Sequence, residues 1–200
     1  MSRPTTLAAK AFKEWAVVCE ALRTGRQVLL LRKGGIHEAK GRFPIEFREF
    51  FLQPTYEHQN LGDLSPDAHA DLARLAAAAP PEGTIRIDGY ATVEEVIVAR
   101  DRDQLARLHG EHVWSESYLD MRLGWKPERP LYLMLLRYYR TPEAMELPMR
   151  KAYGGCRSFV DLETVDVPAE LLAATAGRLV PALDDGAFAA RVSRILELAR

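Results

Sequence analysis

The sequence predicts an α+β fold, with a mixed or barrel-like β-sheet, flanking helices and a C-terminal helical cap. Apolar segments of strand length occur in two groups, with helical segments between and after them, whereas βαβ folds alternate regularly. The apolar residues of the tail show helical spacing. The chain has 200 residues, of which 48% are hydrophobic, enough to bury a core. We expect a core domain over residues 1–165 and a helical cap over 166–200.

The first apolar segments predict a short helix followed by a β-hairpin. Residues 15–22 and 27–31 are apolar and of strand length, and a short loop containing Gly25 separates them. A single helix over residues 7–22 is the alternative, since Leu7, Ala11, Trp15, Cys19 and Leu22 form a helical stripe. We favour the hairpin.

Residues 47–53 predict a third strand that ends at Pro54, because proline cannot continue a hydrogen-bonded ladder. Ser65 and Pro66 then predict a helix that begins with an N-cap and runs to about Ala79.

The second half of the chain predicts further strands. In residues 84–99, Asp88-Gly89 is typical of a turn between two strands. A helix is expected from about Asp101, a core strand over residues 131–139 and a last strand over 158–165.

Composition excludes some classes of protein. The 27 Lys and Arg residues against 28 Asp and Glu residues give a net charge of −1, which excludes the globally basic surface of non-specific DNA-binding proteins. No apolar run is long enough for a membrane span, and no secretory leader is recognisable, so we expect a cytoplasmic protein. The two cysteines fit neither a disulfide framework nor a cysteine-based zinc site, and we expect free thiols.

Two basic stretches alternate with acidic ones. Residues 23–50 hold seven Lys and Arg against three Glu, and residues 122–157 hold eight against three. If they fold together they form a positive face for an anion; the alternative is a mixed, solvated surface.

The first candidate site follows the strand of residues 27–31. Arg32 and Lys33 precede Gly34 and Gly35, so positive charge and backbone N–H groups come together, as an anion cradle requires. The spacing is not that of a P-loop. A tight turn with two solvated cations is the alternative.

The second candidate site is the polar loop after Pro54, which contains Thr55, Glu57, His58 and Gln59. Glu57 beside His58 is suited to acid–base chemistry or metal binding, and loops at strand ends often carry such groups. Alternatively, the polar groups cap the next helix.

A second basic Gly-Gly turn contains Cys156 and Arg157, and the cysteine is either a nucleophile or, as we favour, a small buried residue. Glu38 and Lys40, with Glu20 upstream, match part of a metal-dependent nuclease signature. Aromatic residues interleave with cations between residues 114 and 140, which suits base stacking and phosphate contact, although core packing explains most of these rings more simply.

Several motifs in one order resemble the bacterial family described as domain of unknown function 1802. They are Lys13-Glu14-Trp15, the run from Leu31 to Ile36 with Glu38, the run from Phe50 to Gln59, Trp125-Lys126 and Gly155-Cys156. The resemblance covers about residues 11–165 and implies that the site lies in these polar loops, but it implies no activity. Residues 131–139 are also loosely similar to a strand of PUA-like barrels, small barrels that bind RNA or modified bases, which is an analogy of fold only.

Our leading hypothesis is that the protein binds, and in one version processes, a nucleotide or nucleic-acid phosphate. The expected phosphate ligands are Arg32, Lys33, Gly34, Gly35, Arg48, Lys126 and Arg157. Glu57 and His58 would transfer protons, and Glu38, Thr55 and Gln59 would complete the site. The alternatives are a metal-dependent nuclease that uses Glu20, Glu38, Glu57 and Lys40, and a non-catalytic interaction module. The sequence assigns no cofactor, metal or oligomeric state, and it leaves catalysis open.

Overall fold

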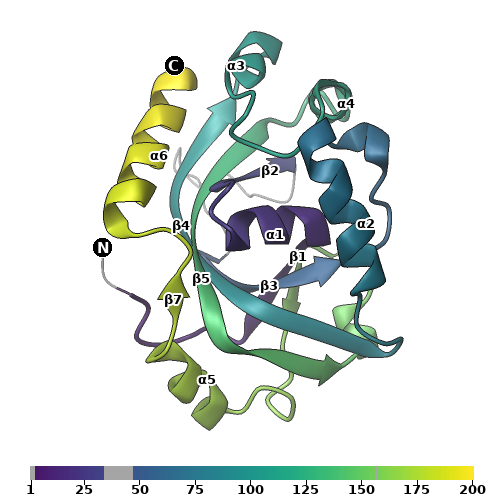
Figure 1. Ribbon diagram of the computed structural model, residues 1–200, viewed down its shortest axis with the longest axis vertical. Helices are drawn as coiled ribbons and strands as arrows, with labels where there is room; N and C mark the ends of the chain where they lie inside the picture. The colour runs from purple at the N-terminus through teal and green to yellow at the C-terminus, as the bar shows by residue number, and fades with distance from the viewer. Residues whose placement is uncertain (1–2, 34–46, 156) are drawn as a thin grey trace.

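The computed structural model describes residues 3–33, 47–155 and 157–200 and shows an α+β fold (Figure 1). Its strands are β1 (Lys10–Trp15), β2 (Leu29–Lys33), β3 (Glu49–Thr55), β4 (Thr84–Ala99), β5 (Leu131–Pro148), β6 (Phe159–Asp161) and β7 (Val180–Pro181). Its α-helices are α1 (Ala16–Arg23), α2 (His69–Ala77), α3 (Arg102–Arg107), α4 (Glu116–Gly124), α5 (Ala169–Ala176) and α6 (Asp185–Leu198). No helix in these ranges has the length and apolar content that a membrane span requires.

The strands form one mixed sheet in the order β2-β5-β4-β3-β1-β6, and β7 pairs with β5. β1 and β3 are parallel, and the other pairs are antiparallel. The sheet curls strongly, so that Arg32 of β2 contacts Phe12 of β1, although β5, β4 and β3 lie between these strands in the sheet order. Of the two predicted forms, the described strands therefore make the mixed sheet, curled but not closed into a barrel by backbone pairing.

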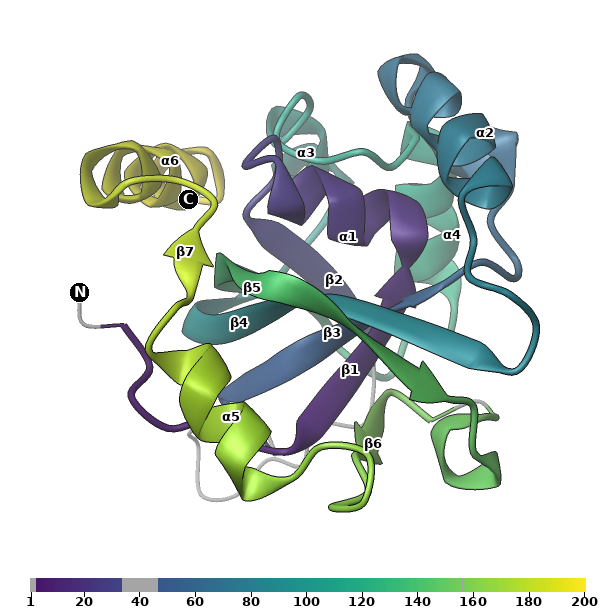
Figure 2. The ribbon, with the colours of Figure 1, turned by 60° about the horizontal axis from the view of Figure 1, so that its bottom comes forward.

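Two hydrophobic clusters lie on the two faces of the sheet. In the first, Val18 and Leu22 of α1 pack on Leu30 and Leu52, and Phe188 of α6 belongs to the same cluster. α1 lies on the concave face of the sheet (Figure 2). The second cluster, on the other face, contains Phe51, Tyr90, Tyr139, Tyr153 and Leu179.

The predicted hairpin over residues 15–31 is wrong in its first half, and the alternative, a single helix over residues 7–22, is correct only for residues 16–22. The helical stripe divides at Trp15, whose ψ of 137° is extended, into β1 and then α1. β1 is buried on both faces, because Ala11 packs in one cluster and Phe12 in the other. Such a strand lacks the alternation of apolar and polar residues that would distinguish it from a helix. The predicted strand over residues 27–31 is confirmed as β2.

The prediction that the third strand ends at Pro54 is wrong. Pro54 is part of β3 and pairs in register with Glu14 of β1. The partner strand on the other side, β4, pairs with β3 only at Glu49–Phe51. Pro54 therefore lies where β3 has lost one neighbour, a position that tolerates a missing N–H donor.

Residues 84–99 form one long strand, β4, and the predicted turn at Asp88-Gly89 is absent. The register against β5 shifts between Ile87 and Gly89 instead. A Cβ atom on Gly89 would lie 1.8 Å from the hydroxyl oxygen of Tyr138, so the glycine permits a close cross-strand approach.

The helix after Ser65, the helix after Asp101, the core strand and the helical tail are confirmed as α2, α3, β5, and α5 with α6. Ser65 is not the predicted side-chain cap, because its hydroxyl donates to the Val113 carbonyl oxygen at 3.2 Å. The last strand predicted over residues 158–165 is shorter, as β6, and β7 follows it in the tail.

Candidate functional site

A cavity of about 670 Å³ lies at the C-terminal ends of β1 and β3. Because these strands are parallel, Lys13–Trp15 and the segment from Gln53 to His58 meet at the same end of the sheet. Tyr118 and Arg122 of α4 form another wall. Its remaining described lining comes from Leu31 and Arg32 of β2, residues 79–85, Trp114, Met149 and the segment from Gly154 to Ser158 that contains Gly155 and Arg157.

Glu14 and Arg32 form a pair of opposite charges in this cavity. Burial raises the pKa of the Glu14 carboxyl above its usual value, although the Arg32 and Arg122 guanidinium groups and the Trp15 N–H oppose that effect. The Trp15 N–H donates to Glu14 Oε1 at 2.7 Å. Burial lowers the pKa of Arg32, and the Glu14 carboxylate opposes this effect. The site thus places the Glu14 carboxyl group next to an arginine that stays charged at neutral pH.

Arg32 is fixed in place but retains hydrogen-bonding capacity. Its Nη2 donates to the Lys13 carbonyl oxygen at 3.1 Å, and its Cζ lies 3.9 Å from the centroid of the Phe12 ring. Its Nε is buried and has no hydrogen-bond partner among the described residues. A buried donor without a partner costs free energy, so this group favours a ligand that accepts a hydrogen bond.

Aromatic rings line the wall beside this pair. The centroids of Trp15 and Tyr118 are 5.1 Å apart, and those of Tyr118 and Trp114 are 6.3 Å apart. Burial raises the pKa of Tyr118 to about 12, so its hydroxyl stays protonated and neutral. This wall offers aromatic surface and a hydroxyl group close to two guanidinium groups.

Cations also line the part of the cavity next to the second Gly-Gly turn. Lys13 Nζ donates to the Gly155 carbonyl oxygen at 2.5 Å, which joins β1 to the second Gly-Gly turn. Gly155 has a φ of 73°, a left-handed conformation that glycine adopts without strain. Arg157 follows this turn, is exposed and lines the cavity.

Five of the predicted site residues line this cavity: Arg32, Thr55, Glu57, His58 and Arg157. The Thr55 hydroxyl donates to the Glu14 carbonyl oxygen at 3.1 Å, which ties the ends of β1 and β3 together. Glu57 and His58 are exposed, and His58 has a left-handed φ of 59°.

Other predicted residues lie outside the lining. Lys33 is buried, and its ammonium group donates to the Leu123 carbonyl oxygen at the end of α4. Arg48 is exposed and precedes β3, and Lys126 lies after α4. Gly34, Gly35 and Glu38 lie outside the described residues, as do Lys40 of the nuclease alternative and Cys156.

Gln59 does not line the cavity; its side chain connects the loop after β3 to the start of α1. Its Oε1 accepts from the Val17 N–H at 3.2 Å, and its Nε2 donates to the Thr55 carbonyl oxygen at 2.9 Å. This agrees with the alternative in which polar groups of the loop cap a helix, although the helix is α1 rather than the next one in sequence.

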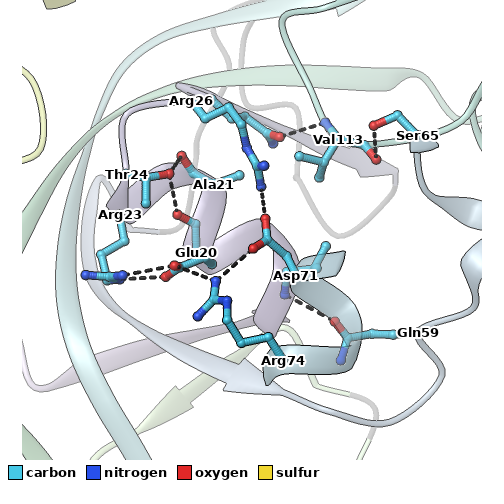
Figure 3. A network of polar contacts seen from close by, with 12 residues as sticks. Glu20, Ala21, Arg23, Thr24, Arg26, Gln59, Ser65, Asp71, Arg74 and Val113 are labelled. Atoms are coloured by element: carbon cyan, nitrogen blue, oxygen red, sulfur yellow. Dashed lines mark hydrogen bonds and ion pairs between the residues drawn. The ribbon is translucent and has the colours of Figure 1, made fainter. Parts of the chain in front are cut away.

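Glu20, the upstream acid of the nuclease alternative, lies in a separate network between α1 and α2 (Figure 3). Its carboxylate accepts from Arg23 at 2.6 Å and from Arg74 at 2.8 Å. Burial raises the pKa of Glu20, but these hydrogen bonds outweigh burial and leave the pKa below its usual value. The described residues contain no group of three or more His, Cys, Asp and Glu side chains placed to hold a metal ion.

Glu14, Trp15 and Gln53 are not among the predicted site residues, and Tyr118 and Arg122 stand out in the sequence only within the aromatic and cationic stretch of residues 114–140. Gln53 is 2% exposed, and its Oε1 has no hydrogen-bond partner among the described residues. Lys13-Glu14-Trp15 stands out only as one of the motifs shared with the family. Its place in the site follows from the parallel pairing of β1 with β3, which no local pattern reveals.

The chain belongs to the family described as domain of unknown function, DUF1802, which it matches over residues 11–194. The match includes most of the helical tail, which the sequence resemblance had left outside the family. No curated protein matches the chain in sequence.

Solved structures of the ASCH protein of Zymomonas mobilis have a similar chain trace at low identity. A serine-to-alanine mutant is 12% identical, with 87% of this chain and 99% of that chain covered and a TM-score of 0.47. Another structure of the protein is 13% identical, with coverage of 81% and 92% and a TM-score of 0.44.

Proposed function

We propose that the protein binds a nucleotide, or one nucleotide of a nucleic acid, in the cavity at the ends of β1 and β3. The observation that carries this proposal is the combination of the half-buried Glu14–Arg32 pair with an aromatic wall and additional cations in one cavity. Its volume of about 670 Å³ lies within the usual range for small-molecule sites.

The base would lie against the aromatic wall. Trp15 and Tyr118 offer aromatic surface for stacking, which every nucleobase can use. The Glu14 carboxylate can accept hydrogen bonds from N–H groups of a base, and Arg32 Nε can donate to a base or phosphate oxygen. Placing both signs of charge beside one wall orients a base, which carries donors and acceptors along one edge.

The phosphate would lie toward Arg122 and Arg157, with Lys13 nearby. Arginine is suited to this task because its planar fork donates two parallel hydrogen bonds to phosphate oxygens. Lys33, already bound to a backbone carbonyl oxygen, stabilises α4 in this proposal instead of binding ligand. Glu57 and His58, which share the cavity, would carry out proton transfer if the ligand is processed.

Isothermal titration with the common nucleoside monophosphates tests the proposal. Arg122→Gln and Arg157→Gln each remove one cavity cation, and Arg178→Gln removes the same charge from an exposed position outside the cavity. We expect the two cavity variants to lose about tenfold in affinity, as for one charge-assisted hydrogen bond, and the control variant to bind like the wild type. Absence of nucleotide binding, or equal losses in all three variants, would overturn the proposal.

A further inference from the structure

An exposed aromatic residue lies directly beside the cavity, after the end of α4. Trp125 is 44% exposed, although large aromatic rings are usually buried in cores or interfaces. Two cations face its ring: Lys126 Nζ lies 4.5 Å and Arg122 Cζ 5.3 Å from the ring centroid. We call Trp125, Lys126 and Arg122 the Trp125 platform.

The backbone of the platform is held in an uncommon conformation. Lys126 has a φ of 49°, a left-handed value that is strained for a residue with a side chain. The Arg129 N–H donates to the Lys126 carbonyl oxygen at 2.9 Å, which closes the turn. The Lys33 ammonium group binds the Leu123 carbonyl oxygen just before it. The turn thus carries Lys126 across the exposed ring and is fixed to β2.

Arg122 connects the platform to the cavity. It lines the cavity, acts on the pKa of both Glu14 and Arg32, and also contacts the Trp125 ring. Its Nε is buried and has no hydrogen-bond partner among the described residues. An acceptor bound to Arg122 would therefore lie between the cavity and the platform.

We infer that the ligand is a single-stranded nucleic acid, with one nucleotide in the cavity and a neighbouring base stacked on Trp125, and that a phosphate between them binds Arg122 and Lys126. This inference rests on the proposed function and specifies its substrate class. Exposed aromatic surface with interleaved cations matches the alternating bases and phosphates of a single strand. A free mononucleotide would leave the platform unused.

The inference is tested by titrating wild-type protein and variants with nucleoside monophosphates and with short single-stranded oligonucleotides of the same bases, as RNA and as DNA. Trp125→Leu removes the stacking ring, Trp125→Phe keeps an aromatic face, and Val165→Ala alters an exposed apolar residue elsewhere, 76% exposed. We expect the oligonucleotide to bind more tightly than the monophosphate. Trp125→Leu should lower only the oligonucleotide affinity, by about tenfold. Trp125→Phe should keep most of that affinity, and Val165→Ala all of it.

Three results would overturn the inference and leave the proposed function intact. In the first, the oligonucleotide binds no more tightly than the monophosphate. In the second, Trp125→Leu lowers both affinities equally. In the third, Trp125→Phe loses as much oligonucleotide affinity as Trp125→Leu, which would exclude stacking. If neither monophosphates nor oligonucleotides bind, the proposed function fails and the inference fails with it.

Discussion

The guanidinium carbon of Arg32 lies 3.9 Å from the centroid of the Phe12 ring, although these residues belong to strands far apart in the sheet order. The same arginine donates to the Lys13 carbonyl oxygen. One side chain therefore bridges the gap between β2 and β1 where backbone pairing does not close the sheet. It also places its charge beside Glu14 at the cavity.

Arg32→Lys should destabilise the protein although it keeps the charge. Lysine lacks the planar group that stacks on Phe12, and its compact ammonium group is more costly to bury than a guanidinium group. We expect a loss of about 1–2 kcal/mol in the free energy of unfolding, measured with urea. Arg86→Lys, at an exposed position of β4, is the matched control and should change little. Equal stability of both variants would show that the guanidinium group contributes nothing specific.

Gly89→Ala should be strongly destabilising. The added Cβ would lie 1.8 Å from the Tyr138 hydroxyl oxygen and 2.1 Å from the ring carbon that bears it, so the buried Tyr138 side chain must leave its packed position. We expect a loss of about 2–3 kcal/mol, measured by urea unfolding. Gly177→Ala, where no atom lies within 4 Å of the added Cβ, should leave stability nearly unchanged. A neutral effect at Gly89 would contradict the close approach of β4 and β5.

His112 should make the protein less stable as the pH falls from about 6.5 to 4. Burial, followed by the charge of His109, lowers the pKa of His112 to about 4. The side chain is 9% exposed, and neither ring nitrogen has a hydrogen-bond partner among the described residues. Between these pH values the unfolded chain binds a proton that the folded chain excludes. Stability is then fully present above about pH 6.5 and is lost by at most about 1.4 kcal/mol per pH unit below it.

Chemical unfolding of the wild type and His112→Phe across this pH range measures that contribution. Phenylalanine can keep the packing against Trp114, whose ring centroid lies 5.5 Å from that of His112, but it does not titrate. The unfolding free energy of the wild type minus that of His112→Phe should rise with pH between about 4 and 6.5 and stay constant above this window. Parallel pH profiles would show that His112 titrates normally in the folded protein.

Glu111→Gln should loosen the attachment of α6. The Glu111 carboxylate is 4% exposed and pairs with Arg191 at 2.5 Å and with Arg194 at 2.7 Å. Because this carboxylate is buried and serves two arginines, we expect its loss to cost about 1–3 kcal/mol. Arg194→Gln should cost less than about 1 kcal/mol, because that side chain is largely exposed. Equal effects of the two substitutions, measured by urea unfolding, would contradict this assignment.

Local patterns predicted the elements whose signals are local. Ser65 and Pro66 at a helix start, the helix expected from about Asp101 and the apolar run of residues 131–139 predicted α2, α3 and β5. Local patterns predicted the wrong secondary structure where tertiary contacts determine it. β1 reads as part of a helix because both of its faces are buried, and Asp88-Gly89 is typical of a turn although Tyr138 requires the glycine. The division at residue 165 stays a prediction.

The candidate site was predicted in part for the same reason. The loop of Glu57 and His58 was found because consecutive polar residues follow a strand, and the structure places it in the cavity. Lys33 and Gln59 belong to motifs that also predicted a binding site. Their side chains bind backbone groups instead and do not line the cavity. Glu14 and Tyr118 join the site only through strand pairing and the position of α4, which depend on the whole fold.

An NMR titration that follows each backbone amide measures whether a nucleotide binds in the cavity at the ends of β1 and β3. Addition of the tightest-binding nucleotide should shift the amide signals of Trp15, Tyr56 and His58, together with that of Gly155 in the second Gly-Gly turn. The signals of residues 143–147, which line a separate cavity, should stay unchanged. Shifts confined to that second cavity, or no shifts at a saturating nucleotide concentration, would contradict the proposed function.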